Sequence, residues 1–255
     1  MTPWEMLAVF AAGTGAGAIN TVVGSGTLIT FPVLLATGLP PVTAVVSNAL
    51  GLIPGSISGA IGYRRELAGQ ARRILKLCVG ALLGGLTGAT LLLALPSSAF
   101  ERIVPVLVGL ALVLVVFQPR ISGAVRRRRE SADRPARRDG GPPLLIGLTL
   151  ASVYGGYFAA AQGIIYVSLM GTLLDEPLQR LNAAKNVLVA VVNAVAALFF
   201  LFVADFDWTA VALIALGSAL GGQIGAAVGR RFSPAVLRTL IVAVGTVAIV
   251  QLVIH

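Results

Sequence analysis

The sequence is poor in charged and aromatic residues. Only 11% of its 255 side chains are charged and 6% are aromatic, whereas 57% are hydrophobic. Soluble globular domains have roughly 25% charged residues, so a water-soluble fold of this length could not bury so much apolar surface. The 30 glycines let apolar helices approach closely in lipid. The composition therefore predicts an all-α integral membrane protein that crosses the lipid bilayer several times.

Residues that form catalytic and metal centres are scarce as well. The chain has one cysteine, Cys78, and one histidine, His255, which excludes an intramolecular disulfide, a cysteine-rich metal site and a histidine ligand in the core. It has no Walker loop and no HExxH or GxSxG motif. The six full apolar spans described below contain no Asp or Glu, so no mid-membrane carboxylate relay for protons or sodium is visible. We therefore expect no enzyme activity, no cofactor and no metal.

Positive charge is confined to the loops. The formal net charge is +9, but the basic residues lie between apolar runs and form no patch interleaved with aromatics, which argues against nucleic-acid binding. The run Arg126–Arg129 belongs to a polar segment, Arg120–Pro143, which we expect to be a disordered cytoplasmic linker near anionic headgroups. A nucleic-acid-binding tail is the less favoured alternative. Since the N-terminus has neither a basic n-region nor an A-x-A-like cleavage site, we expect its first apolar segment to be mature structure.

Two apolar stretches differ from the six others. Each of the six is near the ~20 residues needed to cross a hydrocarbon core, and they run over Val42–Gly62, Ile74–Leu95, Ile103–Phe117, Val187–Val203, Trp208–Val228 and Pro234–Ile254. The two exceptions are too long for one span and short for two. Trp4–Gly38 is interrupted at Gly24–Gly26, and Leu144–Leu174 is interrupted at Gln162–Gly163.

The distribution of Lys and Arg favours a topology in which each interrupted stretch enters and leaves on the same side. If each crossed once, Arg180, Lys185 and the arginines near the C-terminus would fall outside. If each returns, these join the basic loops inside and Arg102 alone stays outside, as the positive-inside rule prefers. This predicts two inverted repeats, each a Gly-interrupted re-entrant helical hairpin plus three transmembrane helices. The predicted parts are the first repeat at 1–119, an Arg-rich cytoplasmic linker at 120–142 and the second repeat at 143–255.

Weak internal similarity agrees with two halves. Ala44–Asn48 aligns with Asn182–Asn186, and each follows its interrupted stretch at about the same distance. Non-helical backbone at membrane depth needs a cavity or protein partners, so matching breaks in inverted halves indicate a transporter's binding site. Free amides in such breaks, reinforced by helix N-termini, would suit an anion. The alternative is that these glycines only permit tight helix packing.

Polar residues near the breaks complete the candidate site. A lysine at the start of an apolar helix either snorkels to the interface or faces a cavity. Because Lys185 aligns with Ser47, we favour a fixed positive charge for a bound anion. Tyr154 and Tyr157 either add hydroxyl donors or only pack. The predicted substrate-binding residues are Asn20, Gly24, Ser25, Gly26, Thr27, Ser47, Asn48, Tyr157, Gln162, Gly163, Lys185 and Asn186.

A family pattern is visible in both halves. Gly15–Arg65 carries a Gly-rich break, a proline, an A-x-x-T/S-N-like segment and a span ending in Tyr-Arg-Arg. In this it resembles the sulfite exporter TauE/SafE family, also called the toluene sulfonate uptake permease family. The second half resembles the family repeat at Val153–Gly163, Asn182–Asn186 and Asp207–Arg231. One departure is that three alanines and Gln162 replace most of a usually glycine-rich second break, which suggests that the Gln162 amide selects the substrate.

The resemblance implies a multi-pass secondary transporter, and specifically an exporter, that carries small sulfur-containing or organic anions such as sulfite or sulfonates across the bacterial inner membrane. Alternating access between the repeats, driven by a coupling ion such as H⁺ or Na⁺, is the expected mechanism. Whether the protein forms a homodimer is left open. Two alternatives remain: a permease or channel for another small solute, and a non-transporting membrane scaffold subunit docked through its Arg-rich linker.

Overall fold

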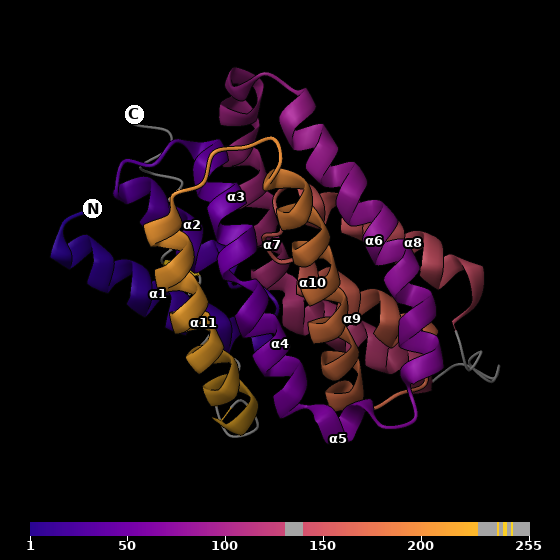
Figure 1. Cartoon of the computed structure of the whole chain (residues 1–255). Helices are drawn as coiled ribbons and strands as arrows, with labels where there is room; N and C mark the ends of the chain where they lie inside the picture. Colours follow the sequence, from indigo (N-terminus) through magenta and orange to yellow (C-terminus); the bar gives the residue numbers. More distant parts are fainter. Residues whose placement is uncertain (131–139, 229–238, 240–241, 244–245, 247–255) are drawn as a thin grey trace.

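The computed structural model describes residues 1–130 and 140–228, together with residues 239, 242, 243 and 246. Over this part of the chain the regular structure is helical, without strands, and the helices pack into one bundle (Figure 1). Their bounds are α1 Pro3–Val22, α2 Thr27–Ala36, α3 Pro41–Gly51, α4 Ile53–Gly62, α5 Arg64–Leu67, α6 Ala71–Ala94, α7 Ser97–Glu130, α8 Gly141–Tyr157, α9 Gln162–Leu173, α10 Leu178–Phe200 and α11 Trp208–Val228.

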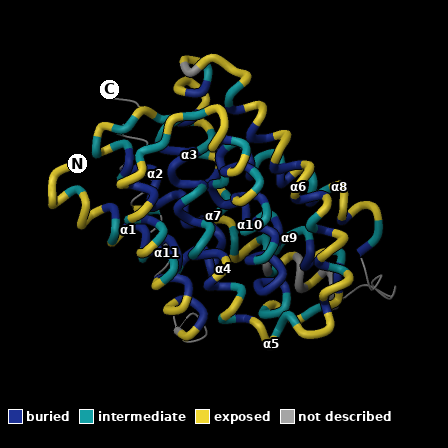
Figure 2. The backbone as a smooth tube through the Cα atoms, viewed as in Figure 1, coloured by how far each residue is buried: buried dark blue, intermediate teal, exposed yellow. Residues whose placement is uncertain are grey.

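Within the part of the chain that the structure describes, five helical segments are long and apolar enough to cross a membrane. They are Pro41–Gly62, Ala71–Ala94, Ser98–Ile121, Leu178–Phe200 and Trp208–Ala227. Large apolar side chains are exposed on the periphery, as Leu75, Val79 and Leu86 are along α6, while buried residues concentrate in the middle of the bundle (Figure 2). The multi-pass membrane class predicted from composition is therefore confirmed. The sixth predicted span, Pro234–Ile254, lies outside the described residues except for isolated positions.

Both interrupted stretches fold as a longer helix followed by a short one. The first gives α1 and α2, and the second gives α8 and α9. The second members have only 10 and 12 residues, well below the ~20 needed for a full crossing. The breaks lie between Val22 and Thr27 and between Tyr157 and Gln162, at or directly beside the interruptions predicted from the sequence.

One predicted span keeps its bounds but is divided into two helices, and two predicted boundaries are corrected. The span expected at Val42–Gly62 matches the candidate span Pro41–Gly62, which consists of two consecutive helices, α3 and α4, that meet at Leu52. Pro54 just beyond has no N–H to continue the helical ladder. The span expected from Val187 begins at Leu178, because its polar first turns are buried against the rest of the bundle. The linker expected to be disordered from Arg120 is helical as far as Glu130, the end of α7; residues 131–139 lie outside the described part.

Glycines set how the two halves interlock. A Cβ placed on Gly17 of α1 would lie 2.3 Å from the carbonyl oxygen of Ser218 in α11, and one on Gly84 of α6 would lie 2.3 Å from the carbonyl oxygen of Thr149 in α8. Only glycine allows such close helix contacts. The first helix of each interrupted stretch therefore packs on a spanning helix of the other half, and neither half forms its core alone.

The basic turn after α4 and the turn between α9 and α10 lie together at one end of the bundle. Nη2 of Arg73 lies 2.8 Å from Oε1 of Glu176, and Nε2 of Gln70 donates to the carbonyl oxygen of Arg180 at 3.3 Å. Figure 1 shows α5 at this end. If both interrupted stretches are re-entrant, the two turns must lie on the same face of the membrane. If each stretch crossed the membrane once, the turns would lie on opposite faces. The inverted symmetry of the halves stays a prediction.

Candidate functional site

The two breaks touch each other in the interior of the protein. The N–H of Gly163 donates to the carbonyl oxygen of Gly24 at 3.0 Å. Gly24 has a φ of +89°, and a Cβ at this position would lie 2.4 Å from the Cα of Gly163. Two independent reasons thus require glycine at 24: the left-handed backbone and the lack of space. We call this contact, with the residues of both breaks, the crossing.

The first break ends in three backbone N–H groups without an acceptor. Within the described residues, the amides of Ser25, Gly26 and Thr27 donate to no carbonyl or side chain. The hydroxyl of Ser25 is also fully buried and unpartnered. These groups form the N-terminus of α2, where amide dipoles favour negative charge. Buried donors without partners are rare in native proteins, so this set is the strongest chemical signal in the molecule.

Lys185 lies against the same break, but not as the sequence suggested. It is inside α10 rather than at the start of a span, with 0% of its surface exposed, so it does not snorkel to the interface. Its Nζ donates to the carbonyl oxygens of Asn20 and Thr21, at 2.7 and 2.9 Å. These are among the last carbonyls of α1, which carry the negative end of the helix dipole. Lys185 therefore caps α1 from the opposite half.

Asn48 and Thr27 fasten the beginning of α2 to α3. Nδ2 of Asn48 donates to the hydroxyl of Thr27 at 3.2 Å, and Oδ1 of Asn48 accepts from the hydroxyl of Thr30. Both atoms of the Asn48 amide are therefore used in holding the short helix. Asn20 makes a comparable contact on the other side of the break, where its Nδ2 donates to the hydroxyl of Ser56 in α4 at 3.3 Å.

Asn186, which aligns with Asn48 in the repeat, is not used in this way. Its Nδ2 is buried and has no partner in the described residues. It lies beside Gly59 of α4, where an added Cβ would be 3.3 Å from that nitrogen and 2.5 Å from the hydroxyl of Thr21. Asn186 therefore provides a further unused donor next to the first break, adjacent in sequence to Lys185.

The second break has a different chemistry. Ala159 and Ala161 both have a left-handed backbone, with φ of 64° and 58°. The hydroxyl of Tyr154 donates to the carbonyl oxygen of Ala160 at 2.7 Å. Nε2 of Gln162 donates to the hydroxyl of Tyr166 at 2.7 Å, whereas its buried Oε1 has no partner.

Two residues of this network were not predicted. Tyr166 and Ser152 share a hydrogen bond between their hydroxyls, and Tyr166 accepts from Gln162. Both are ordinary residues of apolar helices, so only the i, i+4 spacing of Gln162 and Tyr166 could have indicated the pair. The hydrogen bonds fix the Gln162 side chain at the start of α9.

Two predicted site residues take no part in the hydrogen bonding at the crossing. The hydroxyl of Ser47 accepts from the N–H of Asp207 at 3.0 Å, which ties α3 to the turn before α11. The alignment of Ser47 with Lys185 therefore does not correspond to a contact between them. The ring of Tyr157 packs edge-on against Phe100, and its buried hydroxyl has no partner in the described residues.

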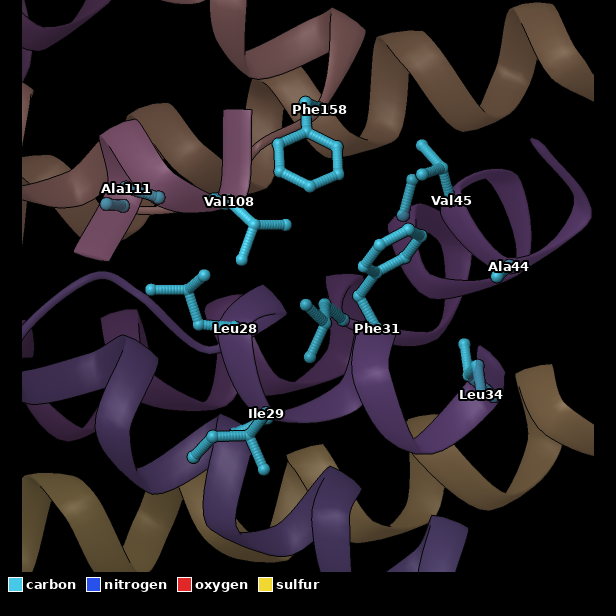
Figure 3. Close-up of a cluster of buried hydrophobic side chains, with 14 of the residues drawn as sticks. Leu28, Ile29, Phe31, Leu34, Ala44, Val45, Val108, Ala111 and Phe158 are labelled. Carbon is cyan, nitrogen blue, oxygen red and sulfur yellow. The ribbon is translucent and has the colours of Figure 1, made fainter. Parts of the chain in front are cut away.

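An apolar layer covers the crossing. Phe31 of α2 meets Phe158 of the second break edge-on, with ring centroids 5.2 Å apart. Figure 3 shows both rings facing Leu28 and Val108, and all four side chains are buried. Aromatic pairs of this kind hold α2 against the other half and exclude water. Over the described residues, no three His, Cys, Asp or Glu side chains group as metal ligands.

Comparisons with known proteins agree with a transporter. A family model described as sulfite exporter TauE/SafE matches residues 9–252. A probable membrane transporter protein of Haemophilus influenzae is 27% identical over 242 residues, covering 93% of this chain and 91% of the relative. The probable membrane transporter protein YfcA of Escherichia coli K12 is 27% identical over 248 residues, covering 97% and 89%. The probable membrane transporter protein ORF9 of Sinorhizobium sp is 25% identical over 247 residues, covering 96% and 90%. No solved structure matches the chain.

Proposed function

This chain belongs to the sulfite exporter TauE/SafE family, and on that premise we propose that it carries a small anion with three oxygens, such as sulfite or a sulfonate, across the bacterial inner membrane. That it is a membrane transporter and not an enzyme follows from the family and from relatives named as transporters. The substrate class, the direction and the mechanism are the proposal.

The observation that carries the proposal is the set of unpaired donors at the N-terminus of α2. Three consecutive amides, those of Ser25, Gly26 and Thr27, together with the Ser25 hydroxyl, have no acceptor among the described residues. A pyramidal oxyanion presents three acceptor oxygens, so it can engage consecutive N–H groups of a helix N-terminus. A carboxylate has two oxygens that share one plane, so it fits a three-amide helix N-terminus less closely than a pyramidal anion, and each buried donor left unpaired costs about 1–3 kcal/mol.

Lys185 favours a bound anion at the N-terminus of α2 without contacting it. The break joins the negative end of α1 to the positive end of α2, and these dipoles would largely cancel at a shared point. Because the Lys185 ammonium binds the carbonyls of Asn20 and Thr21, it neutralises the end that would repel an anion. The field of the α2 N-terminus then dominates.

The second half contributes polar groups of both kinds. Nδ2 of Asn186 is an unused donor for a substrate oxygen. The unpartnered atom of Gln162 is Oε1, an acceptor, because its nitrogen already donates to Tyr166. An acceptor repels a bare oxyanion and prefers a protonated oxygen. Gln162 would therefore favour a substrate that carries a hydroxyl, such as hydrogen sulfite.

Access to these groups requires the crossing to open. A Cβ on Gly26 would lie 2.6 Å from the carbonyl oxygen of Ala16, so the free amides are enclosed by protein. The helices of each half interlock with the other, and rocking of one half would separate the Gly24–Gly163 contact toward one face or the other. This is alternating access with the substrate at the crossing.

Flux into proteoliposomes tests the proposal. Purified protein should transport sulfite and a small sulfonate with saturation, and a carboxylate of similar size at least tenfold less efficiently. Ser25→Ala removes one donor and should raise the half-saturating sulfite concentration about tenfold, the effect of about 1.4 kcal/mol. Ser168→Ala is the matched control, because its hydroxyl only donates to the carbonyl of Ile164 in its own helix.

Two outcomes would contradict the proposal. Equal flux of sulfite and carboxylate would remove the three-donor site as the basis of selectivity. Flux that rises linearly with concentration, without saturation, would indicate a channel instead of a carrier.

A further inference from the structure

A groove on the outside of the bundle takes no part in the proposed anion path. It lies between α4 and α10 and has a volume of about 450 Å³. Ile53, Ile57 and Ile61 form one wall, and Val187, Val191 and Ala194 form the other. The side chains of Ile57 and Ile61 are about half exposed, so the groove opens to the surroundings of the protein. For a membrane-spanning helix pair those surroundings are lipid.

The groove has the length of one bilayer leaflet. It extends from Ile53, where α4 begins, to Arg64, where α5 begins. At 1.5 Å per residue this separation is roughly 16 Å. Half of the ~30 Å hydrocarbon core of a bilayer is about the same length. A single acyl chain that starts at the interface near Arg64 would therefore end near the bilayer centre, at Ile53.

A positive charge that pairs with no described residue lies at the interfacial end of the groove. Arg64 lines the groove and is exposed, and its side chain has no hydrogen bond or ion pair with any described residue. None of the described residues that line the groove is acidic. The positive-inside rule assigns this end to the cytoplasmic face, where the leaflet carries anionic lipids. Guanidinium groups pair well with phosphate.

We propose that this groove binds a phospholipid with an anionic headgroup from the cytoplasmic leaflet. One acyl chain lies between α4 and α10, and the phosphate pairs with Arg64. Because α4 belongs to the first half and α10 to the second, the bound lipid contacts both halves at once. It stabilises the arrangement of the two helices seen here, in the same way as any ligand that binds one conformation preferentially.

Lipid retention by the purified full-length protein tests this site. The protein is delipidated in detergent and titrated with phosphatidylglycerol or phosphatidylcholine, and bound lipid is counted by native mass spectrometry. The wild type should retain one phosphatidylglycerol in preference to phosphatidylcholine. Arg64→Gln should weaken phosphatidylglycerol retention about fivefold, the effect expected for one arginine near a lipid headgroup, and leave phosphatidylcholine unchanged.

Matched variants separate a specific site from general attraction. Arg65→Gln removes the same charge one residue further on, from an exposed side chain outside the groove, and should retain the preference. Ala194→Phe fills the groove and should lower retention of both lipids. Leu198→Phe, an exposed position on the same helix outside the groove, should not.

Three results would overturn the proposal. The first is equal retention of the two lipids by the wild type. The second is equal loss of preference in Arg64→Gln and Arg65→Gln, which would indicate only the general charge of the turn. The third is a dimer that Ala194→Phe dissociates, because the occupant of the groove would then be a second copy of the chain. None of these readouts depends on anion flux.

Discussion

The two breaks occupy matching positions in the sequence but are stabilised in different ways. In the first break Gly24 takes up the left-handed backbone, and the last carbonyls of α1 receive their donor from Lys185 in the opposite half. In the second break alanines take up the left-handed backbone, and the carbonyl of Ala160 receives its donor from Tyr154 in the same hairpin. The first break therefore depends on the other half for its integrity, whereas the second is largely self-contained.

The same contrast separates the two breaks chemically. The first amides of α2 donate to no described residue, while the Gly163 amide at the N-terminus of α9 donates to the carbonyl oxygen of Gly24. A break held from the other side of the protein can offer unpaired groups, because its own backbone need not close on itself. This comparison predicts which substitutions disturb both halves and which stay local.

Replacing Lys185 should have the largest effect. Lys185→Met keeps the volume of the side chain but leaves two buried carbonyls of α1 without a donor, at about 2 kcal/mol each, so we expect a loss of about 4 kcal/mol. Thermal unfolding in detergent measures this loss. Arg72→Met, at an exposed position of α6, is the control. Unchanged stability of Lys185→Met would show that the end of α1 does not rely on the cap from Lys185.

Closing the space between the two glycines should have the next largest effect. Gly24→Ala combines a left-handed backbone with a Cβ 2.4 Å from the Cα of Gly163, for an expected loss of about 3 kcal/mol. Ala161→Gly makes the converse change in the second break. It relieves a left-handed alanine and should raise stability by about 1 kcal/mol. Chemical denaturation measures the free energy of unfolding of both variants. A change of the same sign in both would refute the contrast between the two breaks.

Removing the local cap of the second break should cost less. Tyr154→Phe deletes the hydroxyl that donates to the carbonyl of Ala160 and should destabilise the protein by about 1–2 kcal/mol. Because this cap belongs to its own hairpin, hydrogen exchange should increase in α8 and α9 and remain unchanged in α1 and α2. Exchange that increases equally in both hairpins would show that the second break is not self-contained.

The ionic contact between the halves at the end of the bundle should matter least. Partial burial disfavours ionised Glu176, but hydrogen bonds and charges from Arg73 and Arg180 outweigh this, so the pKa of Glu176 lies below its ordinary value. A lowered pKa stabilises the folded state above the pKa of the unfolded chain, and this contribution disappears as pH falls through the folded pKa. Glu176→Gln should therefore cost at most about 1 kcal/mol at neutral pH.

A pH series of thermal unfolding checks this last prediction. The difference in melting temperature between wild type and Glu176→Gln should shrink as the solution is acidified. A difference that is independent of pH would assign the effect to packing instead of charge. A loss as large as that of Lys185→Met would show that the halves are joined mainly at this end and not at the crossing.

Composition and apolar length determined much of the fold. The scarcity of charge required a membrane, the ~20-residue runs required spanning helices, and the glycines marked where two of the helices break. The basic turns indicated that the segment after Arg64 and the turn before α10 share one face, and the Arg73–Glu176 contact places them together. These properties follow from local sequence, because each depends on the solvation or backbone freedom of neighbouring residues.

The roles of individual polar residues were decided only by the tertiary structure. Lys185 contacts carbonyls more than 160 positions earlier in the chain. Nδ2 of Asn48 donates to Thr27, whereas Nδ2 of the aligned Asn186 has no partner among the described residues. No local pattern encodes which buried donor will find an acceptor, because in lipid-exposed folds that choice depends on which helices interlock. The sequence by itself determined that there are breaks at membrane depth; the packing of one half into the other decided which of them keeps its amides free.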